Sequence, residues 1–217
     1  MTRMLDLGRQ PYRQTLERMR ELHGAVARGE ARETWLVVEH DPVITLGRNA
    51  NRAHVLISGD ALARRGVDLV EVERGGDATY HGPGQLVVYP ILRLERFREI
   101  VPLVSTLERA VVATLATFGI AARTRAEHRG VYVGDDAICA IGLAVKQMTS
   151  LHGLALNVST ELDYDRIITP CGSSQFGITS MTRELARPVP LDEARNALLT
   201  HLCEIFEISL EPKYATC

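Results

Sequence analysis

Short β-rich runs lie between a few amphipathic segments along this chain, and that alternation constrains the fold more than any other feature. Three segments repeat apolar residues at the helical period of 3.6. One follows Pro11, one runs from about Pro102 to Phe118, and one begins near Leu191, with Pro102 and Pro190 suited to helix starts. The expected strands are Trp35–Glu39, Val43–Leu46, Leu69–Glu73, Gln85–Leu92, Val131–Val133, Ile138–Val145 and Leu154–Val158. Strands outnumber helices, which predicts an α/β or α+β fold with helices over a mixed sheet.

Size and charge narrow the function classes. A chain of 217 residues predicts a single domain over residues 1–217. The net charge of −2 provides no basic field for nucleic acid. No run reaches the ~20 apolar residues that span a bilayer, and the first residues lack the apolar core of a secretory signal. We therefore expect a cytoplasmic monomer with no nucleic-acid or membrane partner.

The cysteines and histidines argue against a metal centre. Cys139, Cys171, Cys203 and Cys217 are far apart and form no Cys-x-x-Cys pair. The seven histidines show no metal-ligand spacing. We expect neither a metal nor any other cofactor.

The segment Arg74–Gln85, RGGDATYHGPGQ, contains four glycines between two expected strands. Its backbone N–H groups, with Arg74 and His81, suit a carbonyl, carboxylate or phosphate. It lacks the Gly-Lys-Ser/Thr ending of a P-loop and the Gly-x-Gly-x-x-Gly spacing of a dinucleotide site. Pattern alone favours a binding loop over a decorated hairpin.

A second segment, Thr169–Ser174, places Cys171 between Pro170 and Gly172 in a tight loop. Structural cysteines usually lie in apolar strands or helices, as Cys139 and Cys203 do here. Cys171 is therefore the best nucleophile candidate, and an inert loop cysteine is the alternative. His152, before Gly153, either faces a site or caps an apolar strand.

Together these motifs resemble the lipoyl(octanoyl) transferase family over nearly the whole chain. The motifs are EHDPVITLGR (Glu39–Arg48), RGGDATYHGPGQLVVYP (Arg74–Pro90), Ala140-Ile141-Gly142, HGLALNV (His152–Val158) and Thr169-Pro170-Cys171-Gly172. The resemblance implies the fold of biotin and lipoate ligase catalytic domains: a larger mixed sheet, a smaller sheet and flanking helices.

The implied reaction moves an octanoyl group from acyl carrier protein to a lysine of a lipoyl domain, a step of protein lipoylation. The acceptors would be lipoyl domains of 2-oxoacid dehydrogenase complexes and the glycine cleavage H protein. Cys171 matches the family's nucleophile, which forms an acyl thioester. The residues that match the acyl-substrate segments are Arg74, Gly75, Gly76, Asp77, Ala78, Thr79, Tyr80, His81, Ala140, Ile141, Gly142, Gly153, Leu154 and Ala155.

This chemistry is physically reasonable for such a chain. A thioester donor and a thiol acceptor are nearly isoenergetic, so a cysteine accepts the acyl group without ATP. Burying six or seven methylenes contributes on the order of 5 kcal/mol. Apolar residues of Ile138–Val145 and Leu154–Val158 suit that channel, and N–H groups near Gly76, Gly142 or Gly153 suit an oxyanion.

Ala137 is the main departure from the family, which has a lysine there. That lysine would lower the thiol pKa and relay a proton, whereas an ordinary cysteine is only about 3% thiolate at pH 7. We therefore expect slow transfer. Three explanations are open. The lysine was replaced by design, the natural protein lost its transferase activity, or another residue serves as the base. Only Lys146 and Lys213 are lysines among the 25 cationic residues. Natural drift in such a sequence would replace a lysine by arginine, so the alanine favours an engineered substitution.

The substitute bases considered are Lys146, His81 and His152. Lys146 is a poor one, because it lies nine residues along the strand, up to about 30 Å away and on the opposite strand face.

Two other functions remain open. An ATP-dependent lipoate ligase would need a nucleotide loop and would not need Cys171. A catalytically dead module that binds a carrier protein or lipoyl domain is supported by Ala137 alone. Arg123, Arg125 and Arg129 are either a docking patch for an acidic partner domain or part of an ordinary solvated surface.

Overall fold

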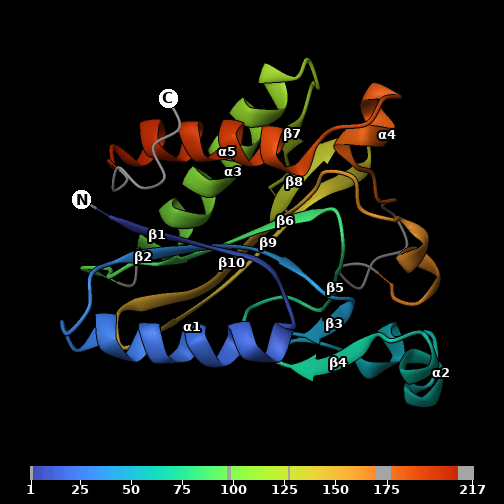
Figure 1. Ribbon diagram of the computed structural model, residues 1–217, viewed down its shortest axis with the longest axis horizontal. Helices are drawn as coiled ribbons and strands as arrows, with labels where there is room; N and C mark the ends of the chain where they lie inside the picture. Colours follow the sequence, from blue (N-terminus) through green and yellow to red (C-terminus); the bar gives the residue numbers. More distant parts are fainter. Residues whose placement is uncertain (1, 97–98, 127, 170–176, 210–217) are drawn as a thin grey trace.

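The computed structural model describes residues 2–96, 99–126, 128–169 and 177–209. Two sheets form the framework (Figure 1). The large sheet has the order β1 (Arg3–Gln10), β2 (Thr34–His40), β6 (Gln85–Ile91), β10 (Thr149–Asn157), β9 (Asp136–Lys146), β8 (Gly130–Val133) and β7 (Arg123–Thr124). The small sheet has the order β4 (Asp68–Glu71), β3 (Val43–Leu46) and β5 (Ala78–His81). Each sheet combines parallel and antiparallel pairs, which confirms the predicted architecture.

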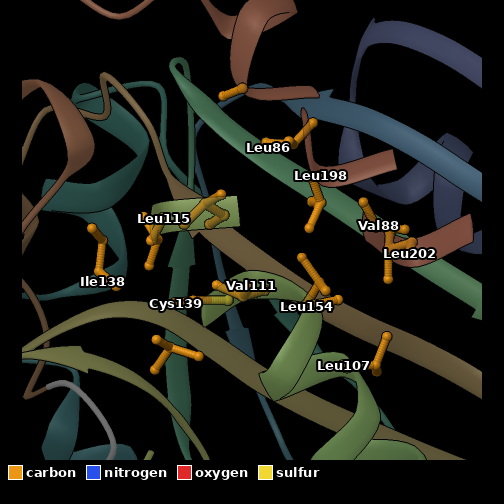
Figure 2. Packing of buried hydrophobic residues seen from close by; sticks show 14 of the residues in the cluster. Leu86, Val88, Leu107, Val111, Leu115, Ile138, Cys139, Leu154, Leu198 and Leu202 are labelled. Atoms are coloured by element: carbon orange, nitrogen blue, oxygen red, sulfur yellow. The ribbon is translucent and has the colours of Figure 1, made fainter. Parts of the chain in front are cut away.

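Helices cover both faces of the large sheet (Figure 1). On one face lie α3 (Ile100–Thr117) and α5 (Leu191–Phe206), and on the other lies α1 (Tyr12–Ala27). Leu107 and Val111 of α3 and Leu198 of α5 share a core with Val88 and Leu154 of the sheet (Figure 2). Burial of such side chains is the main stabilising contribution of a core like this one.

A separate core belongs to the small sheet. Ile44 of β3 packs with Leu62 of α2 (Gly59–Arg64). Ile168 and Ile178 complete this cluster from two later points of the chain. The small sheet is thereby fixed to the segments on both sides of residues 170–176.

The α3 helix is long and apolar enough to cross a membrane by length and composition. Its buried residues pack against the sheet and α5, so a place in the core accounts for its hydropathy. It begins at Ile100, two residues before the predicted start. Pro102 lies in the first turn, where its missing N–H leaves no hydrogen bond unmade.

Several short or polar elements were not predicted. β1 carries charged residues at both ends and alternates weakly, so its sequence lacks a strand pattern. β5 lies within the glycine-rich segment that pattern alone reads as a loop. The short helices α2 and α4 (Met181–Leu185) were also missed, because they are shorter than a periodic signal.

The β9–β10 hairpin depends on glycine at a close approach. Gly153 of β10 lies opposite Gly142 of β9 and beside β6. A Cβ atom at Gly153 would lie 2.0 Å from the carbonyl oxygen of Val88 and 2.7 Å from Cδ of Pro90. The backbones of β10 and β6 therefore approach more closely than any side chain at Gly153 would allow.

A buried polar pair links the neighbouring strands β2 and β6. His40 is fully buried, and its Nε2 lies 2.8 Å from the Tyr89 hydroxyl, while its Nδ1 lies 3.2 Å from the Gln10 carbonyl oxygen. Burial lowers the pKa of His40 to about 4, from an ordinary value of 6.5. The folded protein therefore holds this imidazole neutral.

We predict that Gly153→Ala destabilises the fold by about 2 kcal/mol or more, because the methyl group forces β10 away from β6. Urea denaturation measures the loss. Gly59→Ala is the matched control, since a Cβ there meets nothing within 4 Å. Equal stability of the two variants would contradict the close approach.

We also predict that the free energy of unfolding falls as the pH drops from about 6.5 towards 4. The unfolded chain binds a proton at His40 in this range and the folded chain does not, so acid favours unfolding. The contribution is on the order of 3 kcal/mol. Urea denaturation at pH 7 and pH 4.5 measures it. His40→Gln should show a shallower pH dependence, and an unchanged dependence would contradict the assignment.

Candidate active site

A cavity of about 330 Å³ lies between the two sheets. Its volume is at the lower end for small-molecule sites. All the predicted substrate-segment residues line it except Ala78 and Tyr80: Arg74, Gly75, Gly76, Asp77, Thr79, His81, Ala140, Ile141, Gly142, Gly153, Leu154 and Ala155. Ile100 and Val104 of α3 add apolar wall. Three segments that are far apart in sequence thus meet around one hollow.

The alternation of β5 explains the two exceptions. Ala78 is buried in the core of the small sheet. Tyr80 stacks on Tyr164, with ring centroids 4.5 Å apart. Both face a second, smaller cavity, whereas His81 faces the large one.

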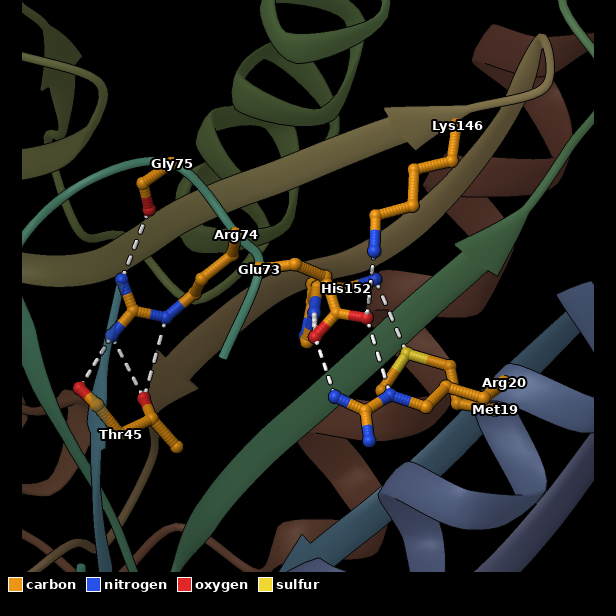
Figure 3. Close-up of polar contacts among 8 residues, drawn as sticks. All are labelled: Met19, Arg20, Thr45, Glu73, Arg74, Gly75, Lys146 and His152. Carbon is orange, nitrogen blue, oxygen red and sulfur yellow. Dashed lines mark hydrogen bonds and ion pairs between the residues drawn. The ribbon is translucent and has the colours of Figure 1, made fainter. Parts of the chain in front are cut away.

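Arg74 anchors the glycine-rich segment (Figure 3). Its Nη2 donates to the carbonyl oxygen and hydroxyl of Thr45, at 2.7 and 2.8 Å, and its Nη1 donates to the Gly75 carbonyl oxygen at 3.0 Å. The Gly75 N–H donates to the Leu143 carbonyl oxygen of β9 at 2.9 Å. The Gly75 N–H and much of the Arg74 guanidinium thus bind the protein itself, while both residues also line the cavity.

A chain of hydrogen bonds runs from the large cavity to the small one. His81 Nδ1 lies 2.8 Å from Gln85 Oε1, and Gln85 Nε2 donates to Asn157 Oδ1 at 2.9 Å. Asn157 Nδ2 donates to the Tyr164 hydroxyl at 3.2 Å and to the Thr179 carbonyl oxygen at 3.0 Å. Gln85 and Asn157 lay within the recognised motifs but were not predicted as site residues. Their buried amides fix His81 and the wall of the small cavity.

One group of polar side chains lines the large cavity. It consists of Tyr12, Tyr89, His81 and His152, and all four are buried. Burial raises the pKa values of Tyr12 and Tyr89 and lowers those of His81 and His152. All four groups are therefore neutral at pH 7. Tyr12 and Tyr89 come from α1 and β6, and no sequence motif marked them.

A charged cluster lies beside His152 (Figure 3). Arg20 donates to both carboxylate oxygens of Glu73, at 3.2 and 2.9 Å, and Lys146 Nζ lies 3.6 Å from the same carboxylate. His152 Nε2 is 3.5 Å from Glu73 Oε2. His152 and Arg20 hold the pKa of Glu73 well below its usual range. Lys146 thus pairs with Glu73 at the far end of β9 from Ala137.

The small cavity, of about 40 Å³, contains Ala137. It has room for a few water molecules. Ala137 N–H donates to the Gly177 carbonyl oxygen at 2.9 Å, and the Ala137 carbonyl oxygen accepts from Thr179 N–H at 3.0 Å. Ile168 and Ile178 also line this cavity. Cys171, the predicted nucleophile, lies outside the described residues.

Cys139 lines the small cavity as well, but burial raises the pKa of its thiol. A neutral, fully buried thiol is a poor nucleophile, which agrees with its reading as a structural cysteine. Within the described residues, no group of three or more His, Cys, Asp or Glu side chains could hold a metal ion.

The expected docking arginines all have acidic neighbours. Arg123 and Arg125 pair with Asp135, and Arg129 pairs with Glu108. Arg125 also lies over the Tyr132 ring, 4.9 Å from its centroid. These contacts favour the solvated-surface interpretation over a basic patch open to a partner.

Curated relatives share most of the chain. An octanoyltransferase from Syntrophobacter fumaroxidans is 42% identical over 205 residues, covering 94% of this chain and 90% of that protein. An octanoyltransferase from Acidobacterium capsulatum is 45% identical over 197 residues, covering 84% and 80%.

Solved structures share the fold. A bipartite lipoate protein ligase from Thermoplasma acidophilum superimposes with a TM-score of 0.76 at 21% identity, covering 97% of this chain and 84% of that one. A biotin protein ligase from Aquifex aeolicus gives a TM-score of 0.55 at 12% identity, covering 94% and 69%. The family described as the lipoyl protein ligase A/B catalytic domain matches residues 11–203. Given this match and the 42% identical octanoyltransferase, the chain belongs to the lipoyl protein ligase A/B catalytic-domain family.

Proposed function

We propose that this protein transfers an octanoyl group from acyl carrier protein to a lysine of lipoyl domains, through a thioester on Cys171. The cavity framed by residues 74–81, 140–142 and 153–155 is the observation that carries the proposal. The identity to octanoyltransferases supports the acyl group and the acceptor class. The acceptors would be lipoyl domains of 2-oxoacid dehydrogenase complexes and the glycine cleavage H protein.

The proposed reaction has two acyl-transfer steps. The Cys171 thiolate attacks the thioester carbonyl of the donor, a tetrahedral intermediate forms, and the carrier thiolate leaves and takes a proton. The lysine amine of the acceptor then attacks the new thioester. An amide forms, the amine loses a proton, and Cys171 is released.

The two cavities suggest where the acyl chain lies. Ala140 and Ala155 line both of them, so the reacting carbonyl would lie at this junction. Ile168 and Ile178, which precede and follow residues 170–176 in the sequence, line the small cavity. From the junction the chain would run along β9 and β10 between Ile141 and Leu154, where apolar contact favours it.

We propose that Ala137 impairs the first step. The polar residues that line the small cavity are Thr79, Tyr80, Gln85, Asn157 and Tyr164. Burial raises the pKa of Tyr80, so it is not a base at neutral pH. Lys146 pairs with Glu73 instead. Within the described residues, no cationic side chain lines the small cavity to take the place of a lysine at 137.

A catalytically dead binding module is the second candidate, and Ala137 is the observation that favours it. Such a module would bind the carrier protein or lipoyl domain but would form no acyl-enzyme, which distinguishes it from a transferase. ATP-dependent lipoate attachment is the test that separates a ligase from both.

Cys171→Ser should abolish formation of the acyl-enzyme, because a serine hydroxyl is not ionised at neutral pH. The measurement is intact mass after incubation with octanoyl-acyl carrier protein, where one octanoyl group is expected on the parent chain. Cys139→Ser is the matched control and should still acylate. An adduct that survives Cys171→Ser would contradict the assignment.

Ala137→Lys should accelerate acylation by about 100-fold or more, because a positioned ammonium stabilises the thiolate and general acid–base catalysis is worth that much. Quenched-flow mass spectrometry gives the rate. Ala137→Met fills the same space without a charge and should not accelerate. Acceleration by methionine, or none by lysine, would contradict the proposed role of position 137.

A further inference from the structure

Two backbone hydrogen bonds join the loop around Leu56 to the segment that leads to Cys171. The N–H of Leu56 donates to the carbonyl oxygen of Ile167 at 2.9 Å, and the N–H of Thr169 donates to the carbonyl oxygen of His54 at 2.8 Å. Thr169 is two residues before Cys171 in the sequence. The loop is therefore a direct neighbour of the chain that leads to the proposed nucleophile.

The side chain of Leu56 is turned outward from this loop. Its neighbours Val55 and Ile57 pack on the core of the small sheet, whereas Leu56 is 52% exposed. Leu56 and Val101 are the two exposed large apolar residues in the part of the chain that the structure describes. A single exposed leucine is common on protein surfaces, so its surroundings decide its significance.

Arginines flank Leu56 on both sides in the sequence. Residues 48–65 contain four arginines and one acidic residue, Asp60, in a chain whose net charge is −2. One of the arginines, Arg52, pairs with Glu71 at 3.2 Å. The other three form no side-chain hydrogen bond or ion pair with any described residue. The four exposed arginines are Arg48, Arg52, Arg64 and Arg65.

These arginines extend from the cavity to the outer end of the small sheet. The N–H of Arg48 donates to the Arg74 carbonyl oxygen at 3.0 Å, so Arg48 adjoins the glycine-rich segment that lines the large cavity. Arg64 ends α2, which lies at the outer end of the small sheet (Figure 1), and Arg65 follows it. Leu62 of α2 is 1% exposed and packs in the core. The core therefore fixes the helix that presents these two charges.

We propose that Leu56 and the four arginines form a docking surface for the acidic protein domain that carries the acyl donor. An apolar centre with a charged rim is the usual composition of a protein interface, and opposite charges steer association. The donor holds its acyl group on a long flexible arm, so the body of the domain can bind beside the cysteine. An acceptor lysine has a short side chain and needs contact directly at the cysteine. This inference rests on the proposed acyl transfer.

The test compares two donors with the same thioester. Octanoyl-acyl carrier protein has a protein surface, and octanoyl-pantetheine has none. Arg64→Glu/Arg65→Glu should lower kcat/KM for acyl-enzyme formation from the carrier protein by about tenfold or more, mainly through KM, because the reversed charges oppose association. The rate from octanoyl-pantetheine should not change, which also shows that the variant is folded. Intact mass against time gives both rates, in the parent protein and with Ala137→Lys.

Two further variants define the surface. Leu56→Ala should raise KM for the carrier protein without affecting octanoyl-pantetheine, because it removes the apolar centre. Arg18→Glu/Arg109→Glu is the matched control, since it changes the net charge equally through exposed arginines of α1 and α3. It should leave both rates unchanged. Added salt should slow the parent protein with the carrier donor alone.

The outcomes separate the docking surface from the proposed function. If Arg64→Glu/Arg65→Glu slows both donors equally or neither, the surface is wrong and labelling by octanoyl-pantetheine still supports the transferase. If that variant slows only transfer from the preloaded acyl-enzyme to a lipoyl domain, the surface belongs to the acceptor and the assignment to the donor is overturned.

Titration calorimetry with the carrier protein tests the surface without turnover. We expect weaker binding to Arg64→Glu/Arg65→Glu than to the parent protein, and equal affinity would overturn the proposal. If neither donor labels the parent protein or Ala137→Lys, the proposed function fails, and calorimetry decides whether the surface binds the carrier.

Discussion

The buried guanidinium of Arg74 is the contact on which the architecture of the site depends. It is 6% exposed and binds Thr45 of the small sheet, while its neighbour Gly75 binds Leu143 of the large sheet. The two sheets are therefore connected through two adjacent residues. Burying a cation is costly unless its hydrogen bonds are satisfied. The Thr45 and Gly75 oxygens help to satisfy them, and the cavity lies in the space between the sheets that this contact defines.

The cavity that results differs in polarity along its length. Ile141 and Leu154 give the cavity apolar wall, whereas neutral histidine and tyrosine side chains line another part of it. Desolvation keeps those groups uncharged, as the lowered pKa values of His81 and His152 indicate. An acyl chain in this cavity, as we propose, would gain free energy against the apolar walls.

Much of this could be predicted from the sequence, and the reasons for the failures are physical. Periodicity located the long helices and most strands, and the motifs located the residues around the cavity. The cavity tyrosines Tyr12 and Tyr89 were missed, because they reach the site only through tertiary packing of α1 and β6. The contact of Arg74 with Thr45 could not be predicted either, because it joins two segments that meet only in the folded chain. The prediction that Lys146 lies far along the strand from Ala137 is confirmed, since the two residues are at opposite ends of β9.

The central proposal is that the cavity between the sheets holds the acyl chain, with its carbonyl near Ala140 and Ala155. A crystal structure of the protein after reaction with an octanoyl thioester tests this most directly. The account predicts electron density for an eight-carbon chain between β9, β10 and the segment after Arg74, continuous with Cys171. An acylated protein whose chain lies elsewhere, with this cavity containing only solvent, would contradict it.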